Sequence, residues 1–288
     1  MLFLQLLAQG IITGSFYALA GVSWGIIYRT TLTFHFAHHL VFAVSGFAAA
    51  LATTDLGFHY LLGLGMSIFF AALVGSLIDA LLYKTLRKAG ASKATTFLAS
   101  LGLATAGVAV LLLIFSSTPR SVKGFPIKTL SLGPVFFTTA DVAMVLASTA
   151  ATGLVFLFLG KSRYGKVIRA VGSNRDMAFN VGINIDHVYV LVYSIGSALF
   201  GLAGFLFTVK NAAYPTMGLH PFFISFTAVF LGGVPSILGH ALAGFLLGLA
   251  ENIGMIVLPG EYKLMIAYGI LFIVILVRPE GLIGRRRG

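Results

Sequence analysis

Long apolar stretches separated by short polar segments make up most of this chain. A helix needs about 20 consecutive apolar residues to cross a lipid bilayer, so each stretch of that length predicts one membrane span. Six stretches are clear: Leu2–Ile27, Phe34–Thr54, Phe58–Leu82, Ala94–Ser117, Thr139–Gly160 and Val188–Val209. The pattern therefore predicts a polytopic bundle of membrane helices.

The region after Lys210 is harder to divide, because its apolar run is about twice as long as one span. Within it, Gly232–Ser236 has the sequence GGVPS, and Gly and Pro interrupt helices more strongly than other residues. This segment divides the run into Met217–Gly233 and Ser236–Leu258, and a last span follows at Tyr262–Val277. The sequence thus predicts about eight to nine segments, with the divided run forming two full crossings or a re-entrant pair.

The composition supports a membrane protein. Only 9% of the 288 residues are charged and 58% are hydrophobic, whereas soluble domains carry roughly 25% charged residues. We therefore expect an all-α integral membrane protein with a single transmembrane domain over residues 1–288. The absence of cysteine excludes disulfides and thiolate metal sites. Met1–Gly10 lacks the basic region of a cleavable signal peptide, so we expect the first span to be retained.

The net charge of +11 would suit a nucleic-acid partner, but the basic residues fall in short clusters between the spans. Such clusters set membrane orientation, because cytoplasmic loops are enriched in Lys and Arg. Fourteen of the 19 basic residues are predicted to share one side: Arg29, Lys84, Arg87, Lys88, Lys93, Lys161, Arg163, Lys166, Arg169, Arg175, Arg278, Arg285, Arg286 and Arg287. The other side holds Arg120, Lys123, Lys128, Lys210 and Lys263. We therefore expect the N-terminus outside, the C-terminus in the cytoplasm, and no nucleic-acid partner.

Two polar segments are long enough to have a role of their own. The outer one, Ser117–Phe137, is rich in Gly and Pro, which predicts an irregular, non-helical loop. The inner one, Lys161–Asp186, mixes charged residues with apolar ones such as Met177 and Phe179. From the residues alone it is either a solvated linker or a short helix that lies against a partner.

Glycines spaced four residues apart predict close helix packing, because small residues let helix backbones approach each other in lipid. The pairs are Gly10/Gly14, Gly21/Gly25 and Gly244/Gly248, and Gly196, Gly201 and Gly204 line another helix.

The densest polar group is His35, His38 and His39, which share one face of a helix. That geometry could bind a metal, but the other four histidines are isolated and provide no second histidine box. Hydrogen bonds to neighbouring backbone are another explanation, and we favour a place along a polar pathway. Glu251 is the only acid that we place well inside a span. At a cost of about 2.5–3.5 kcal/mol, it either lines the pathway or locks helices together, beside Asn252.

No enzyme motif is found in the sequence. It lacks a nucleophile elbow and paired carboxylates, and Gly160-Lys161-Ser162 lacks the earlier glycine of a phosphate-binding loop, since position 155 is Val. We therefore expect no catalytic residue, and any energy from ATP has to come from a partner.

Several stretches, in collinear order over nearly the whole chain, resemble the permease subunits of ABC importers for branched-chain amino acids, the family called LivH-like. They are Gly14-Ser-Phe-Tyr-Ala-Leu19, Phe34-His-Phe-Ala-His38, Tyr164-Gly-Lys-Val-Ile-Arg-Ala170, Gly182-Ile-Asn184, Leu231-Gly-Gly-Val-Pro-Ser236, Glu251-Asn252 and Arg278-Pro-Glu-Gly-Leu282. Isolated residues of the pattern, among them Asn174, Ala178 and Gly239, match as well.

This resemblance implies a permease of the bacterial inner membrane that works by alternating access. Its implied partners are a second permease subunit, expected to be a paralogue, two cytoplasmic ATPase subunits that bind ATP and Mg²⁺, and an external solute-binding protein. The chain itself would hold no cofactor and no metal. The segment 161–186 becomes the coupling loop, with Gly165, Arg169, Ala170, Asn174, Arg175, Ala178 and Gly182 as its ATPase-coupling residues. The pathway candidates are Phe34, His35, His38, His39, Glu251 and Asn252.

The implied substrate is a hydrophobic or branched-chain amino acid or a related small organic solute. His35 and His39 stand where the family usually has Asn and Gly, so urea, short amides and aromatic carboxylates stay open as alternatives. A self-sufficient ion-coupled transporter and a membrane enzyme with a histidine-bound metal are the rival functions. The first needs paired acids within the spans, and the second needs a bound metal.

Overall fold

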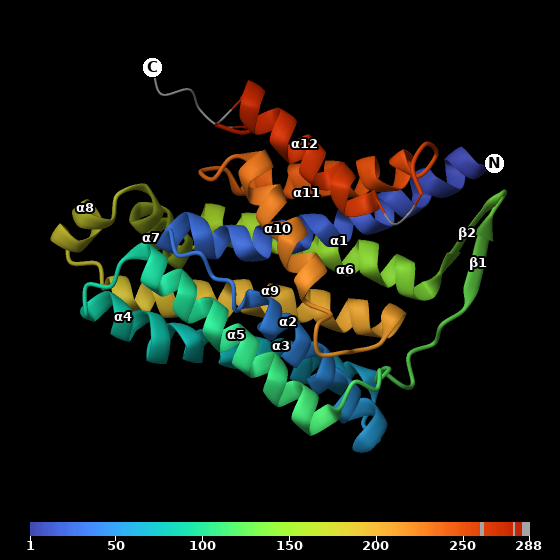
Figure 1. The fold of residues 1–288 in the computed structure, drawn as a ribbon, viewed down its shortest axis with the longest axis horizontal. Coiled ribbons are helices and arrows are strands. Elements are labelled where there is room, and N and C mark those ends of the chain that lie inside the picture. The colour runs from blue at the N-terminus through green and yellow to red at the C-terminus, as the bar shows by residue number, and fades with distance from the viewer. Residues whose placement is uncertain (260–261, 279, 284–288) are drawn as a thin grey trace. The chain divides into compact units, whose positions relative to one another are not determined.

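The computed structural model describes residues 1–259, 262–278 and 280–283 (Figure 1). The described elements are α1 (Leu2–Thr31), α2 (His38–Ala50), η1 (Leu51–Asp55), α3 (Tyr60–Leu77), η2 (Ile78–Tyr83), α4 (Lys84–Lys88), α5 (Lys93–Phe115), β1 (Thr129–Leu132), β2 (Val135–Thr138), α6 (Thr139–Lys161), α7 (Arg163–Ser173), α8 (Arg175–Asn180), α9 (Ile185–Asn211), α10 (Leu219–Gly232), α11 (Ile237–Gly254) and α12 (Lys263–Val277). Here η denotes a π-helical turn. The protein is mostly helical, which confirms that part of the prediction.

The chain divides into two compact units. The first unit comprises Met1–Gly25, Pro126–Gly153 and Phe223–Gly288, and the second comprises Ile26–Phe125 and Leu154–Phe222. Each unit is described below by itself. The single domain over residues 1–288 stays a prediction.

In the described part of the chain, six helical segments are long and apolar enough to cross a membrane. They are Leu2–Thr31, Tyr60–Lys88, Lys93–Phe115, Thr139–Lys161, Ile185–Asn211 and Ile237–Gly254, and each overlaps a predicted span. α10 and α12 have 14 and 15 residues, or about 21–23 Å at 1.5 Å per residue, less than the ~30 Å hydrocarbon core. The number of crossings and the orientation stay predictions, and the basic residues 285–287 lie outside the described residues.

Two helix boundaries bear on the predicted spans. α10 ends at Gly232 and α11 begins at Ile237, which confirms the break predicted at Gly232–Ser236. Ser236 caps α11 by accepting a hydrogen bond from the Gly239 amide at 3.0 Å. The predicted span Phe34–Thr54 contains α2, which begins only at His38 and has 13 residues, so it is not among the six segments long enough to cross a membrane. Leu32, with a left-handed φ of 51°, directly follows the end of α1.

The segment Ser117–Phe137, which was predicted to be an irregular loop, contains most of a two-stranded hairpin. β1 and β2 pair antiparallel with Leu132 opposite Val135. Gly133 has a φ of 58° and Pro134 a fixed negative φ, a pair that suits a tight hairpin turn. The side chain of Gln5 then completes the free edge of β2, since it donates to the Phe136 carbonyl at 2.8 Å and accepts from its amide at 2.9 Å.

Small residues bring α2, α3 and α9 together in the second unit (Figure 1). A Cβ atom on Gly201 would lie 2.5 Å from Ala71 Cβ and 2.9 Å from the Ser67 carbonyl oxygen. The Ser67 hydroxyl lies 2.9 Å from the Ser45 carbonyl and 3.0 Å from the Gly201 carbonyl. It therefore joins α3 to both of its neighbours, as expected of small and hydroxylated residues between membrane helices.

Glycines also interlock α1 and α11 in the first unit. A Cβ on Gly14 would lie 2.6 Å from the Phe245 carbonyl oxygen, and one on Gly244 would lie 2.5 Å from the Tyr17 carbonyl oxygen. Gly248 in turn faces the backbone of Gly14. Close packing at Gly14, Gly244 and Gly248 was predicted from their spacing, and it is confirmed here.

Gly201→Ala is expected to destabilise the protein by about 1–3 kcal/mol, because the new methyl group overpacks the α3–α9 contact and meets backbone that cannot move aside. The matched control is Gly102→Ala in α5, where nothing lies within 4 Å of an added Cβ. Equilibrium unfolding in mixed micelles measures both. Equal effects of the two changes would contradict the role given to Gly201.

Candidate functional site

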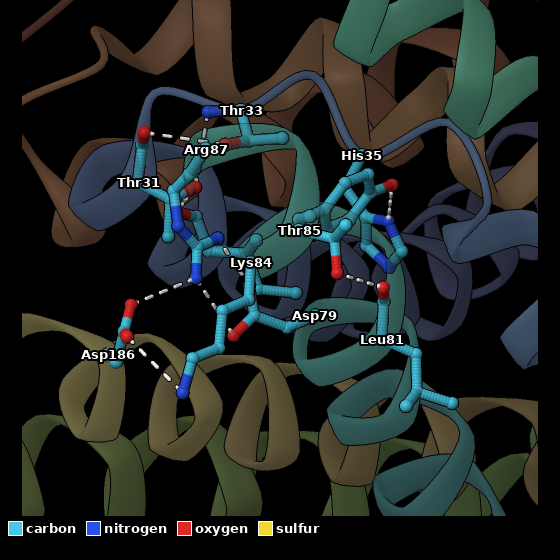
Figure 2. Close-up of polar contacts among 11 residues, drawn as sticks. Thr31, Thr33, His35, Asp79, Leu81, Lys84, Thr85, Arg87 and Asp186 are labelled. Carbon is cyan, nitrogen blue, oxygen red and sulfur yellow. Dashed lines mark hydrogen bonds and ion pairs between the residues drawn. The ribbon is translucent and has the colours of Figure 1, made fainter. Parts of the chain in front are cut away.

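An ion cluster with one fully buried carboxylate lies at the junction of η2, α4 and α9 (Figure 2). Asp79 in η2 is fully buried, and it accepts a hydrogen bond from Arg87 with 2.6 Å between Nη1 and Oδ1. Asp186, in the first turn of α9, lies 3.5 Å from Arg87 Nη2 and 3.3 Å from Lys84 Nζ. Two carboxylates thus balance two cations. That balance matters because an uncompensated charge is costly to bury.

Two arginines share the ring of Tyr189 in α9. The Arg87 guanidinium carbon lies 4.7 Å from the ring centroid, and that of Arg175 lies 5.9 Å from it. Both distances fit cation–π contact. Because Arg175 is the first residue of α8, this ring ties the segment 161–186 to α9 and to the ion cluster.

Hydrogen-bonded caps define the corners of the segment 161–186. Ser162 accepts from the Gly165 amide at 2.8 Å and begins α7, and Asn174 accepts from the Met177 amide at 2.9 Å and begins α8. Asn184 accepts from the His187 amide at 3.1 Å and begins α9. Side-chain oxygens at these positions satisfy helix amides that otherwise lack partners. The segment is therefore built of short helices.

Two predicted coupling glycines have clear conformational roles. A Cβ on Gly165 would lie 2.6 Å from Leu159 Cα, so only glycine lets α7 fold back against the end of α6. Gly182 has a φ of 86°, which L side chains rarely adopt. Its amide donates to the Phe179 carbonyl at 2.9 Å, and the Ile183 amide donates to the Ala178 carbonyl at 3.1 Å. These bonds end α8 in the manner of a glycine C-cap.

The segment carries apolar side chains that the chain itself does not cover. Tyr164 is 66% exposed, Met177 66%, Phe179 68% and Val181 73%. Of the predicted coupling residues, Gly165 and Ala178 are buried, Arg169 is half-buried, and Ala170, Asn174, Arg175 and Gly182 are exposed. Exposed apolar side chains of this kind are typical of sites that contact another protein or the membrane.

The three predicted histidines come together in the second unit. The ring centroids of His35 and His38 lie 5.1 Å apart, and His38 stacks on Phe200 at 4.1 Å. Both histidines are fully buried, and His39 is 3% exposed. The Nδ1 atom of His39 lies 2.8 Å from the Phe36 carbonyl.

His35 is the first member of a chain of buried hydrogen bonds. Its Nδ1 atom lies 2.8 Å from the Tyr83 hydroxyl, which lies 2.6 Å from Ser100 Oγ. Ser100 also accepts from the Ala37 amide at 2.9 Å. Phe34, the fourth candidate of this neighbourhood, packs edge to face on Phe97 of α5. The non-helical segment before α2 is therefore fastened to η2 and α5.

Within the part of the chain that the structure describes, no three His, Asp or Glu side chains form a group able to hold a metal ion. The imidazoles of the histidine cluster instead contact Tyr83, Phe200 and Phe36.

Glu251 and Asn252 are buried in the first unit. The Tyr17 hydroxyl donates to Glu251 Oε2 at 2.8 Å, and Asn252 donates to the Gly248 carbonyl at 2.8 Å. Tyr17 belongs to the Gly14–Leu19 motif of α1. Two sequence motifs that are far apart in the chain thus meet through one hydrogen bond.

The sequence did not predict the ion cluster, and the prediction that Glu251 is the only acid well inside a span is wrong. Asp79 lies inside the observed apolar helical segment Tyr60–Lys88 and is fully buried, so Glu251 is not the only acid well inside a span. The signal was present: a carboxylate within an apolar stretch needs a cation, and Arg87 lies about two helical turns further along. The contribution of Asp186 depends on the return of the chain at α9, which residue spacing does not reveal.

Known proteins match the sequence of this chain over nearly its whole length. The family model described as "Branched-chain amino acid transport system / permease component" matches residues 6–275. The branched-chain amino acid permease protein BraD of Pseudomonas aeruginosa is 28% identical over 98% of this chain and 96% of its own. LivH of Escherichia coli K12 gives the same three values, 28%, 98% and 96%.

Among solved structures, PsaBC from Streptococcus pneumoniae in complex with Fab has a TM-score of 0.55 and 14% identity. The match covers 96% of this chain and 92% of that one. At this identity the likeness concerns the fold.

Asp79→Asn is expected to destabilise the protein by about 3 kcal/mol, because breaking a buried pair leaves Arg87 without its nearest carboxylate. Asp55→Asn is the matched control. It breaks the Arg120–Asp55 pair, which has the same 2.6 Å distance but side chains 32% and 42% exposed, and should cost less than about 1 kcal/mol. Unfolding in mixed micelles measures both, and a double change to Asp79→Ala and Arg87→Met should recover part of the loss. Equal costs for Asp79→Asn and Asp55→Asn would show that burial does not govern the cluster.

Proposed function

This chain belongs to the family of permease components of branched-chain amino acid transport systems, and we propose that it is the membrane-spanning permease subunit of an ABC importer. It moves a hydrophobic or branched-chain amino acid, or a related small organic solute, into the cytoplasm by alternating access. Urea, short amides and aromatic carboxylates are the alternative cargoes. The observation that carries the proposal is the family match over residues 6–275.

The proposed assembly contains a second permease subunit, expected to be a paralogue, two cytoplasmic ATPase subunits and an external solute-binding protein. ATP and Mg²⁺ are bound by the ATPase subunits, and this chain acts as a transport subunit rather than an enzyme. It resides in the bacterial inner membrane, with its N-terminus outside and its C-terminus in the cytoplasm. The distribution of Lys and Arg supports this orientation.

The segment 161–186 is the proposed coupling element. Its exposed apolar residues, Met177 and Phe179 foremost, supply a surface that an ATPase groove can cover. Movement of α8 reaches the membrane helices through Arg175 and Tyr189, and from there through Arg87 to Asp79. Residues in this chain of contacts are positioning residues, because they transmit a displacement and touch no nucleotide.

Phe34, His35, His38, His39, Glu251 and Asn252 are the proposed pathway residues. All of them except Phe34 are buried, so alternating access would have to separate helices before solute reaches them. Glu251 is the sharpest candidate, because it is a fully buried acid that accepts a hydrogen bond from Tyr17 of the Gly14–Leu19 motif.

Phe179→Asp and Met177→Asp are each expected to weaken binding of a cognate ATPase at least tenfold. Each change removes apolar surface whose burial contributes about 1.5–3 kcal/mol, and tenfold in affinity corresponds to about 1.4 kcal/mol. Co-purification and titration of the detergent-solubilised complex measure the effect. The matched control is Leu132→Asp on the hairpin, where the leucine is 74% exposed.

Two results would contradict this proposal. One is an unchanged ATPase affinity in both variants of the coupling element. The other is solute transport by the chain alone in proteoliposomes without ATP.

Glu251→Gln is expected to lower transport by an order of magnitude or more while leaving stability within about 1 kcal/mol, because the amide keeps a hydrogen bond with Tyr17. Tyr17→Phe is the companion variant, since it removes the donor and retains the acid. Transport assays and unfolding of both proteins separate the roles. A loss of stability without a specific loss of transport would identify Glu251 as a structural lock.

A further inference from the structure

A basic cavity of about 410 Å³ lies within the second unit, apart from the histidine cluster. It is formed by the end of α1, the segment after it, the start of α5, the α7–α8 junction and Tyr189 of α9. Four cationic side chains line it, namely Arg29, Arg87, Lys93 and Arg175, and its lining contains no carboxylate.

Most of this positive charge is not balanced by the protein. Arg87 is paired with Asp79 and Asp186. Arg29, Lys93 and Arg175 form no ion pair with any described residue. Three like charges that converge on one cavity repel each other, and they repel more strongly near a low-dielectric bilayer than in water. The cavity is therefore electrostatically suited to an anion.

The rim of the cavity is apolar on one side. Leu32 and Phe34 line it, and Leu32 is 54% exposed. The backbone of Leu32 has a φ of 51°, a conformation that is a genuine outlier for a bulky residue. An exposed leucine held in a strained conformation beside a basic cavity fits a ligand that is charged at one end and apolar at the other.

We propose that this cavity binds the phosphate of an acidic phospholipid from the cytoplasmic leaflet, with Arg29, Lys93 and Arg175 around the phosphate and Leu32 against the acyl chains. Basic pockets between membrane helices on the cytoplasmic side bind lipid headgroups in this way. The inference rests on the proposed orientation, which places the end of α1 at the cytoplasmic face.

Through this site, a bound lipid contacts the proposed coupling element directly. Ser173 and Arg175 of the α7–α8 junction line the cavity, and Arg175 also contacts Tyr189. A bound acidic lipid neutralises the repulsion among the cations and fixes this junction. Transport then depends on the acidic lipid content of the membrane.

The test uses the full chain, purified in a neutral detergent without ATPase or solute, so that its outcome is independent of transport. Native mass spectrometry measures the binding of phosphatidylglycerol and of phosphatidylcholine, and inorganic phosphate is added in a separate arm. Phosphatidylglycerol is expected to bind preferentially, and Arg29→Gln and Lys93→Gln should each weaken it about fivefold. The matched control is Lys128→Gln, in the segment before the hairpin, which should leave binding unchanged.

A second measurement does not depend on how the charge variants fold. The chain has no cysteine, so Ser173→Cys introduces a single thiol at an exposed position of the cavity. Phosphatidylglycerol should slow labelling of this thiol by a polar maleimide severalfold, and phosphatidylcholine should not.

Three outcomes would overturn the proposal. Equal binding of the two lipids would remove the role of the phosphate charge. Protection by inorganic phosphate alone, as strong as that by phosphatidylglycerol, would assign the cavity to a soluble anion. Protection only when the ATPase is added would make it a protein contact. If transport fails while lipid protection persists, only the proposed function is contradicted.

Discussion

A carboxylate inside a membrane protein remains charged only when a cation is held against it, and the Asp79–Arg87 pair meets this condition at 2.6 Å. The pair does more than satisfy Asp79. Arg87 also reaches Asp186 and the ring of Tyr189, both in α9. The same guanidinium therefore fixes η2 against the start of α9, where the segment 161–186 rejoins the membrane helices. The geometry of that segment depends on this compensation.

Asp79 and Glu251, two of the buried acids, accept hydrogen bonds from different kinds of donor. Asp79 faces a guanidinium, whereas Glu251 accepts from the neutral hydroxyl of Tyr17. A charge-assisted bond holds its carboxylate more strongly than a neutral donor does. Asp79 therefore suits a structural role, whereas Glu251 is the proposed pathway acid. The proposed source of energy is coupling to partner ATPases.

Local patterns in the sequence predicted many of the helices and their breaks, but they did not predict contacts between residues far apart in the chain. Apolar length located the helices, GGVPS located the break before α11, and glycine spacing located the α1–α11 contact at Gly14, Gly244 and Gly248. The hairpin was not predicted because Gln5, which hydrogen-bonds to the free edge of β2, is 131 residues away from Phe136. The ion cluster was not predicted because Asp186 lies 99 residues from Arg87. In addition, a hydropathy average over a span is hardly changed by a single acid such as Asp79. The predicted coupling and pathway residues could be named from a family pattern, but their partners Tyr189, Tyr83 and Tyr17 could not.

The segment 161–186 can transmit a force only if the turns between its helices are rigid. Capping bonds at Ser162, Asn174 and Asn184 hold the starts of α7, α8 and α9, and Gly182 closes α8. A displacement applied to Phe179 therefore moves a connected set of short helices instead of being absorbed by a flexible loop. The basic cavity lies beside the α7–α8 junction, and its cations Arg29, Lys93 and Arg175 repel each other there. An anion bound in this cavity neutralises the repulsion beside the capped α7–α8 junction, so the proposed lipid site lies next to the proposed coupling element.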